Sequence, residues 1–298
     1  MRPHGLFVTI GCAVATGCGG TMVDLGIPHP APYQFKTPRE LSELDTTYAN
    51  SNPTLTADLL EIFFSTNRSD MQGDVWTARR ASPKDPFDPP ALVAEVSSPS
   101  YETSPAVSLD GLSIYVGSDR DGGLGDIDIW GATRPDRTTA WSAVTDLAAM
   151  NSTVKDVPRP PGQHGLVMPM SSERDSVGSY RTFLAARPSV DQPFATPTVM
   201  VGLTGASTTL DDAFLTDDGL TLFYASAPVG GTTRDLFVAW RASTADPFSL
   251  PTPLRDLNSP ADERDPWLSP DGTTFFFSSD RDNGVLQIFE AAASRQTR

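Results

Sequence analysis

Cysteine, histidine and positive charge are all scarce in this sequence, and each scarcity excludes a class of protein. The two cysteines are Cys12 and Cys18, too few for the disulfide framework of small secreted domains. The three histidines lie far apart in the sequence and leave no cluster for zinc. The 22 Lys and Arg residues face 37 Asp and Glu residues, for a formal net charge of −15. This charge disfavours nucleic acid, whose phosphates require a basic surface.

Long hydrophobic runs and long amphipathic helices are also missing. The apolar stretch Leu6–Val14 is far shorter than the roughly 20 residues that span a bilayer. The common enzyme signatures are absent as well: there is no Gly-x-Ser-x-Gly elbow, no phosphate-binding glycine loop and no His-Glu-x-x-His. Without a disulfide, the fold depends on a packed core, which a chain of this length can build.

The N-terminus has the features of an export signal. Arg2 precedes the apolar stretch, which ends in Ala15-Thr16-Gly17-Cys18. Small residues before a cysteine resemble the bacterial lipobox, which implies diacylation of Cys18 and cleavage before it. We therefore expect a lipoprotein signal peptide over residues 1–17 and a lipid-anchored tether over residues 18–31. A cut after Ala15 is the alternative, and it would leave Cys18 as an unpaired thiol.

Two markers recur five times along the chain. An Asp-Gly pair, or a degenerate form of it, precedes an apolar run, and an aromatic residue lies beside a Pro-rich stretch. The first marker is Asp58-Leu59, Asp110-Gly111, His164-Gly165, Asp218-Gly219 and Asp271-Gly272, at steps of 52, 54, 54 and 53 residues. The second is Phe35, Phe87, Trp141, Phe194 and Phe248, at steps of 52, 54, 53 and 54 residues. A period this long, built of short strand-like runs, indicates a β-propeller.

Each repeat contains four strand-like segments, except the last, which stops after its third. The N-terminal segment Pro32–Leu44 matches the missing piece, because it resembles Pro247–Leu257 of the preceding repeat. Residues 33–47 are therefore expected to pair with residues 285–293, which closes the ring and removes an exposed edge. The sequence predicts an all-β fold over residues 32–298: a five-bladed β-propeller of four-stranded blades.

The repeat resembles the TolB-type, WD-like propeller repeat. The resemblance rests on Ser108–Gly122 and on Trp267–Asp282 and extends over almost all of the chain after the signal. It implies an envelope propeller. TolB has six blades and a separate N-terminal domain, so the resemblance does not extend to TolB's own role. Gly19 replaces the Asp that retains lipoproteins at the inner membrane, which favours the periplasmic side of the outer membrane.

Two functions remain open on this scaffold. The first is a non-catalytic binding or scaffold protein that recognises an envelope protein, peptide or glycan. It would be a monomer with no cofactor, and it would touch the membrane only through its lipid. The alternative is a glycoside-active enzyme with carboxylates from several blades around the central channel, for which Asp212 and Asp265 are the candidate pair.

Residues just before or within each first strand are the binding candidates, since first strands line the channel of a propeller. They are Asn52, Ser104, Asp212, Glu263, Arg264 and Asp265. The competing interpretation is that these residues form turns and strand caps, which Asp, Asn and Ser do well.

Recurring residues outside the channel are expected to have structural roles. The arginines of the polar loops, Arg68, Arg120, Arg174 and Arg281, are interpreted as partners in ion pairs that hold neighbouring blades together. The turn residues Asp110, Gly111, Asp218, Gly219, Asp271 and Gly272 serve the repeat itself. Asp119, Asp121, Asp126 and Asp128 could offer oxygens to Ca²⁺, but Arg120 among them would repel a cation, so no metal site is assigned.

Overall fold

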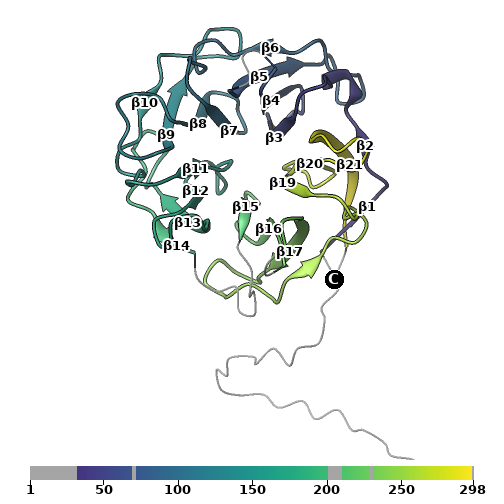
Figure 1. Cartoon of the computed structure of the whole chain (residues 1–298). Helices are drawn as coiled ribbons and strands as arrows, with labels where there is room; N and C mark the ends of the chain where they lie inside the picture. The colour runs from purple at the N-terminus through teal and green to yellow at the C-terminus, as the bar shows by residue number, and fades with distance from the viewer. Residues whose placement is uncertain (1–31, 69–71, 201–209, 229–230, 297–298) are drawn as a thin grey trace, which may run out of the picture.

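Five antiparallel sheets surround a common axis (Figure 1), as the repeat predicts. The computed structural model describes residues 32–68, 72–200, 210–228 and 231–296. Within these ranges, no helix is long and apolar enough to span a membrane. The predicted signal peptide and tether, including Cys18, lie outside the described residues.

The strands of each blade run outward from the axis in chain order (Figure 1). Blade one contains β3 (Asn50–Leu55), β4 (Glu61–Thr66), β5 (Asp74–Arg79) and β6 (Ala91–Leu92). Blade two contains β7 (Glu102–Val107), β8 (Ser113–Ser118), β9 (Asp128–Thr133) and β10 (Thr145–Asp146). Blade three contains β11 (Asp156–Pro158), β12 (Val167–Ser172), β13 (Arg181–Ala186) and β14 (Thr198–Val199). Blade four contains β15 (Asp211–Leu215), β16 (Thr221–Ser226), β17 (Asp235–Trp240) and β18 (Thr252–Pro253).

The fifth blade is completed from both ends of the chain. It contains β19 (Glu263–Leu268), β20 (Thr274–Ser279) and β21 (Gln287–Arg295), and its outer edge is formed by β1 (Tyr33–Phe35) and β2 (Arg39–Glu40). Phe35 pairs with Ala293 and Glu40 pairs with Phe289, and a short 3-10 helix, η1 (Ser42–Leu44), leads on to blade one. The predicted ring closure is confirmed.

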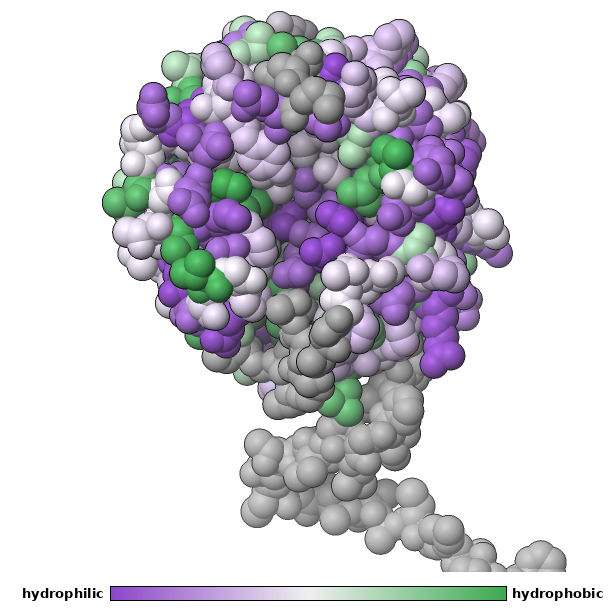
Figure 2. Space-filling model, in the orientation of Figure 1, coloured by the Kyte–Doolittle hydropathy of each residue, from purple (hydrophilic) through white to green (hydrophobic). Residues whose placement is uncertain are grey.

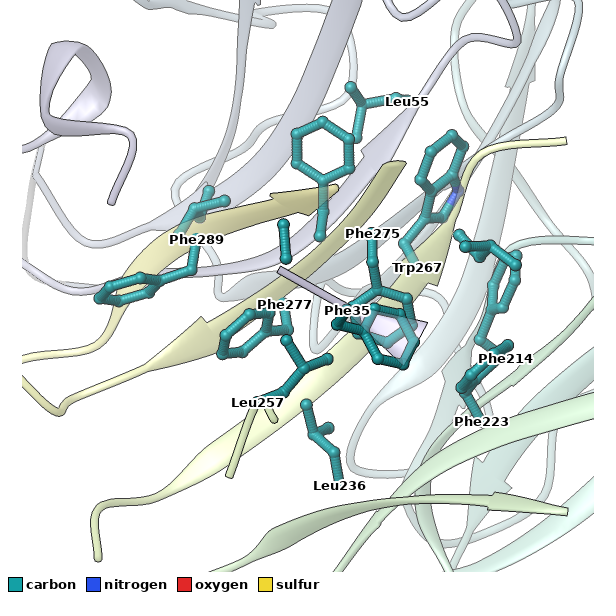
Figure 3. Close-up of a cluster of buried hydrophobic side chains, with 14 of the residues drawn as sticks. Phe35, Leu55, Phe214, Phe223, Leu236, Leu257, Trp267, Phe275, Phe277 and Phe289 are labelled. Atoms are coloured by element: carbon teal, nitrogen blue, oxygen red, sulfur yellow. The ribbon is translucent and has the colours of Figure 1, made fainter. Parts of the chain in front are cut away.

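The hydrophobic core lies between neighbouring blades. Its largest cluster joins blades four, five and one (Figure 3), where Phe275 meets Phe223 and Phe35 at ring-centroid distances of 5.1 Å and 5.0 Å. Trp267 and Phe277 are fully buried beside them. Burying such a side chain contributes about 1.5–3 kcal/mol, so these contacts stabilise the closure of the ring.

A second set of arginines connects the two sequence markers of the repeat. In blades one to four, one arginine after the third strand donates its Nε–H to a carbonyl of the Asp-Gly-type turn and stacks on the aromatic residue of the following link. These arginines are Arg80, Arg134, Arg187 and Arg241; their Nε–O distances are 2.7, 2.7, 2.8 and 2.9 Å, and their distances to the ring centroids of Phe87, Trp141, Phe194 and Phe248 are 4.4, 4.2, 4.4 and 4.5 Å. The two markers keep one period because they are parts of one contact.

The polar-loop arginines form a different contact, which we call the blade clamp. Arg120 donates to the carbonyl of Val96 in the incoming link at 2.6 Å and to Glu102 of β7 at 2.9 Å. The clamp therefore ties a blade to the link that enters it, and its two side chains belong to the same blade rather than to neighbouring blades. It recurs as Arg174 with Asp156, Arg281 with Glu263 and, with an amide in place of the acid, Arg68 with Asn50, at 2.7, 3.0 and 2.7 Å.

The turn residues adopt the backbone that their types favour. Gly111, Gly219 and Gly272 have φ of 74°, 68° and 71°, in the left-handed region that glycine enters at little cost. The preceding aspartates, Asp110, Asp218 and Asp271, each accept the backbone N–H two residues later. In blade one, Leu59 takes the glycine position with a φ of 61°.

Candidate functional site

Four first strands share an unusual backbone at one mouth of the channel. Asn52, Ser104, Asp212 and Asp265 have φ between 51° and 57°, and the pairing of each strand with its neighbour shifts register there. Such a conformation costs a non-glycine residue on the order of 1–3 kcal/mol, and strain of this kind is concentrated at functional sites. All four residues line the same cavity.

This cavity, which we call the mouth, has a volume of about 210 Å³. Figure 2 shows it as a hollow at the centre of the ring, with strongly hydrophilic residues inside. Blades four and five contribute Asp211, Asp212, Arg234, Arg264 and Asp265, whereas blades two and three contribute Tyr101, Ile127, Val157 and Tyr180. Blades two and three also contribute Thr103, Ser104, Arg159 and Ser171. The mouth therefore has an ionic wall on blades four and five and, on blades two and three, an aromatic wall in which apolar and aromatic residues lie beside polar side chains.

Two carboxylates at the mouth share one guanidinium. Arg159, which follows β11, hydrogen-bonds Asp212 through one terminal nitrogen and lies 3.6 Å from Asp265 Oδ1 through the other. Asp265 also accepts the backbone N–H of Asn52 at 3.0 Å and its side-chain N–H at 2.6 Å. One cation thus serves two acids, which lie on neighbouring blades.

This crowding changes the acidity of the site. Burial, and then the neighbouring charge of Asp212, raise the pKa of Asp265 to about 6, although Arg159 and Arg264 oppose the rise. Burial and Asp212 also raise the pKa of Asp211. A carboxyl group with a pKa near neutral can give up and regain a proton at physiological pH, as general acids and bases do.

Two buried polar atoms at the mouth have no hydrogen-bond partner among the described residues: Asp211 Oδ1 and Arg264 Nε. Their other atoms are engaged, because Arg264 pairs with Asp262, and Arg234 lies 3.4 Å from Asp211 and 3.3 Å from Asp262. A buried donor or acceptor without a partner costs about 1–3 kcal/mol. An acceptor and a donor without partners beside one cavity are what a polar ligand would satisfy.

Five of the six predicted binding residues line the mouth: Asn52, Ser104, Asp212, Arg264 and Asp265. Glu263 does not. It is fully buried in the blade clamp of Arg281, because successive side chains of β19 point to opposite sides of the strand.

Arg159 and Tyr180 were not singled out from the sequence. Arg159 lies between two prolines of blade three, and the first of them, Pro158, stands at the repeat position of the strained residue in the other blades. Arg159 itself takes the position that has Pro or Ala in the other four blades. That break in the repeat was a usable signal for Arg159. Tyr180 comes from the loop before β13, and its position in the repeat carries no comparable mark.

The aspartates considered for Ca²⁺ are not assembled into a metal site in the described part of the chain. No group of three or more His, Cys, Asp or Glu that could hold a metal occurs there. Asp119 accepts the backbone N–H of Tyr101 at 2.8 Å, and Asp128 accepts those of Leu124 and Gly125 at 2.5 and 2.9 Å. Asp119 thus holds its loop against the link before β7, and Asp128 stabilises the loop that precedes β9.

Comparison with known proteins gives the fold and not the activity. No family model matches the sequence, and no curated protein matches it. Among solved structures, the catalytic domain of a family 62 α-L-arabinofuranosidase from Coprinopsis cinerea matches at a TM-score of 0.61 and 12% identity, covering 89% of this chain and 98% of that one. An endo-arabinase from Bacteroides thetaiotaomicron matches at 0.57 and 12% identity, over 89% and 98% of the two chains. A TolB-like protein from Agrobacterium tumefaciens matches at 0.50 and 13% identity, over 83% and 78%.

Proposed function

We propose that the mouth binds a carbohydrate and that the protein is a glycoside hydrolase that uses Asp265 and Asp212. The observation that carries this proposal is the pair of carboxylates on one guanidinium, one with a raised pKa, beside an open cavity. Glycoside hydrolysis requires one carboxyl group that is protonated and one that is ionised.

The two roles follow from the surroundings of each acid. Asp265, whose pKa is about 6, donates its proton to the oxygen of the glycosidic bond as that bond breaks. Asp212, hydrogen-bonded to Arg159, faces the positive charge that develops on the sugar. Water then adds to the sugar carbon, and its spare proton restores the acid.

Two further features support a carbohydrate. With Asp265 protonated, the charges at the mouth balance: Asp211, Asp212 and the adjacent Asp262 stand against Arg159, Arg234 and Arg264, which favours an uncharged polyhydroxyl ligand over a phosphate. Several structures with a similar fold are glycoside hydrolases. This similarity of fold supports glycoside hydrolysis, although the same scaffold also serves other functions.

The direct test is hydrolysis of a panel of substrates by the full chain. The panel contains linear arabinan, arabinoxylan, cellotriose and nitrophenyl glycosides, and the measurement is the release of sugar or nitrophenol. Asp265→Asn and Asp212→Asn are expected to abolish release, whereas the exposed carboxylate variant Asp136→Asn should not change it. Release that survives both mouth variants would remove these residues from the reaction.

A binding protein without catalysis is the second candidate, and one observation favours it. Asn52 donates a hydrogen bond to each oxygen of Asp265. This arrangement fixes the carboxyl group, which suits an acceptor of hydrogen bonds from ligand hydroxyl groups as well as it suits a proton donor. In this case calorimetry would detect binding of an oligosaccharide, protein or peptide without any product. An envelope location with an anchor at Cys18 belongs to the proposal in either case, and labelled palmitate incorporated by the wild type and not by Cys18→Ala would test it.

A further inference from the structure

We infer that the mouth is a blind pocket that takes the terminal sugar unit of a chain, held between the aromatic wall of blades two and three and the ionic wall of blades four and five. This inference rests on the proposed function and adds the part of the substrate that enters. It predicts action at chain ends rather than along a chain.

The pocket is blind because the channel narrows directly beneath the two carboxylates. Asn52, Ser104, Arg159, Asp212 and Asp265 line the mouth and also a second, smaller space next to it. That space measures only about 20 Å³, room for about one water molecule. Its other lining residues include Pro53, Pro105, Pro158, Pro160 and Pro266. Proline rings have few alternative conformations, so this constriction should not open to pass a sugar.

The volume of the mouth fits a small ligand. Cavities that enclose a drug-sized molecule measure about 300–1,000 Å³, whereas the mouth has about 210 Å³. One sugar ring can enter, and the rest of the chain must extend outward over the rim. A polysaccharide bound at an internal unit would need a groove that is open at both ends. The described residues around the mouth instead form a closed ring of five blades.

The unlike walls match the two sides of a sugar ring. A pyranose or furanose has a face of C–H bonds and a rim of hydroxyl groups. Tyr101, Val157 and Tyr180 offer apolar surface to the face, and aromatic rings provide much contact area with little loss of side-chain freedom. On the opposite wall, the acceptor Asp211 Oδ1 and the donor Arg264 Nε have no partner among the described residues. A hydroxyl group can satisfy either of them, since it both donates and accepts.

The products of linear arabinan test the inference, followed over time by size-exclusion chromatography and mass spectrometry. We expect arabinose as the only early product and little change in polymer length. Intermediate oligosaccharides with a rapid fall in polymer length would overturn the blind pocket and leave the hydrolase intact. If arabinan is not cut, the substrate cut most rapidly in the panel replaces it.

A binding measurement covers the case in which no substrate is cut. Calorimetry compares cellotriose, or the oligosaccharide of the panel that binds best, with the same molecule carrying a benzylidene group on its non-reducing terminal unit. A loss of affinity of at least tenfold on blocking supports the inference, and equal affinity overturns it. Absence of both hydrolysis and binding across the panel would refute the proposed function, and the inference with it.

Variants of the aromatic wall provide a separate check. Tyr180→Ala is expected to weaken the binding or the kcat/KM of the chosen sugar at least tenfold, and Tyr180→Phe should restore most of it, because the ring and not the hydroxyl group makes the contact. Tyr48→Ala is the matched control, since Tyr48 is an exposed tyrosine outside the mouth. An unchanged Tyr180→Ala with a normal melting temperature would argue against stacking on this wall.

Discussion

The blade clamp and the mouth use the same residue types, Arg with Asp or Glu, and differ in how completely their hydrogen bonds are made. Glu102 in the clamp accepts from Ser98, Ser118 and Arg120 and is fully buried. Asp211 and Arg264 at the mouth each keep a buried atom without a partner among the described residues. The hydrogen bonds of Glu102 are complete, whereas the mouth has a buried acceptor and a buried donor that the proposed ligand would satisfy. Such atoms are not confined to the mouth, since Arg80 Nη2 also has no partner among the described residues.

Blades four and five both contribute to the ionic wall of the mouth, but only blade five also has a clamp among its described residues. Leu210, the residue before Asp211, takes the repeat position that the acid of the clamp has in blades two, three and five, because Asp211 pairs with Ala225 of β16. Ala227 replaces a residue of the polar loop. The blade contributes two carboxylates, Asp211 and Asp212, to the mouth instead. Blade four therefore supplies much of the ionic wall without a clamp among its described residues.

The largest effect should be on activity and should come from the mouth. Asp265→Asn keeps the shape of the side chain and removes the acid, and general acid catalysis contributes about 10²–10⁴-fold to a rate. We expect kcat on the best substrate to fall by that factor while the protein stays folded by circular dichroism. Glu102→Gln is the matched control in the clamp, and it should change the activity per folded molecule less than about twofold. Equal losses in both variants would mean that the mouth has no special role.

The clamp should show the opposite behaviour. Glu102→Ala leaves the Arg120 guanidinium partly buried without its carboxylate, and breaking a buried pair in this way costs about 3–5 kcal/mol. Urea unfolding should record that loss. Glu102→Gln should cost clearly less, because Asn50 in blade one shows that an amide oxygen can accept from the equivalent arginine at 2.7 Å. If Gln were as damaging as Ala, the charge rather than the hydrogen bond would hold the clamp.

The contrast also explains what could be predicted from the sequence. The blades, their number and the closure by Phe35 follow from the repeat, because each blade is a local unit whose markers recur. The mouth residues Asp212 and Asp265 were reachable for the same reason. Arg159 and Tyr180 could not be predicted in this way. The mouth is assembled from several blades, and its residues depend on where individual blades depart from the repeat. Glu263 was predicted to face the channel and instead lies in the clamp. Neighbouring residues of a strand point to opposite sides, so a difference of one residue decides between the two positions.

The pH dependence of stability separates the two regions further. The pKa of Asp265 in the folded protein is about 6, above its ordinary value of 3.8, so the folded state favours the protonated acid. Its contribution to stability is therefore complete below about pH 4 and is lost as the pH rises through 6. We expect wild type to lose on the order of 1–3 kcal/mol relative to Asp265→Asn between pH 4 and pH 7.5. Parallel stability curves for the two proteins over this range would contradict the raised pKa.

The smallest effect should come from the arginines that join the turn to the link. Arg187→Ala removes one hydrogen bond to Gly165 and one stack on Phe194, and each is worth about 0.5–2 kcal/mol. Blade five has Ala293 at the equivalent position, which shows that a blade can form without this arginine. We expect a loss of about 1–2 kcal/mol in urea unfolding, with activity unchanged because the turn is remote from the mouth.

Arg181→Ala, which breaks an exposed pair with Asp175, is the control and should lose less than about 1 kcal/mol. A larger loss for Arg181 than for Arg187 would show that the stacked contact is not what keeps the two markers in step.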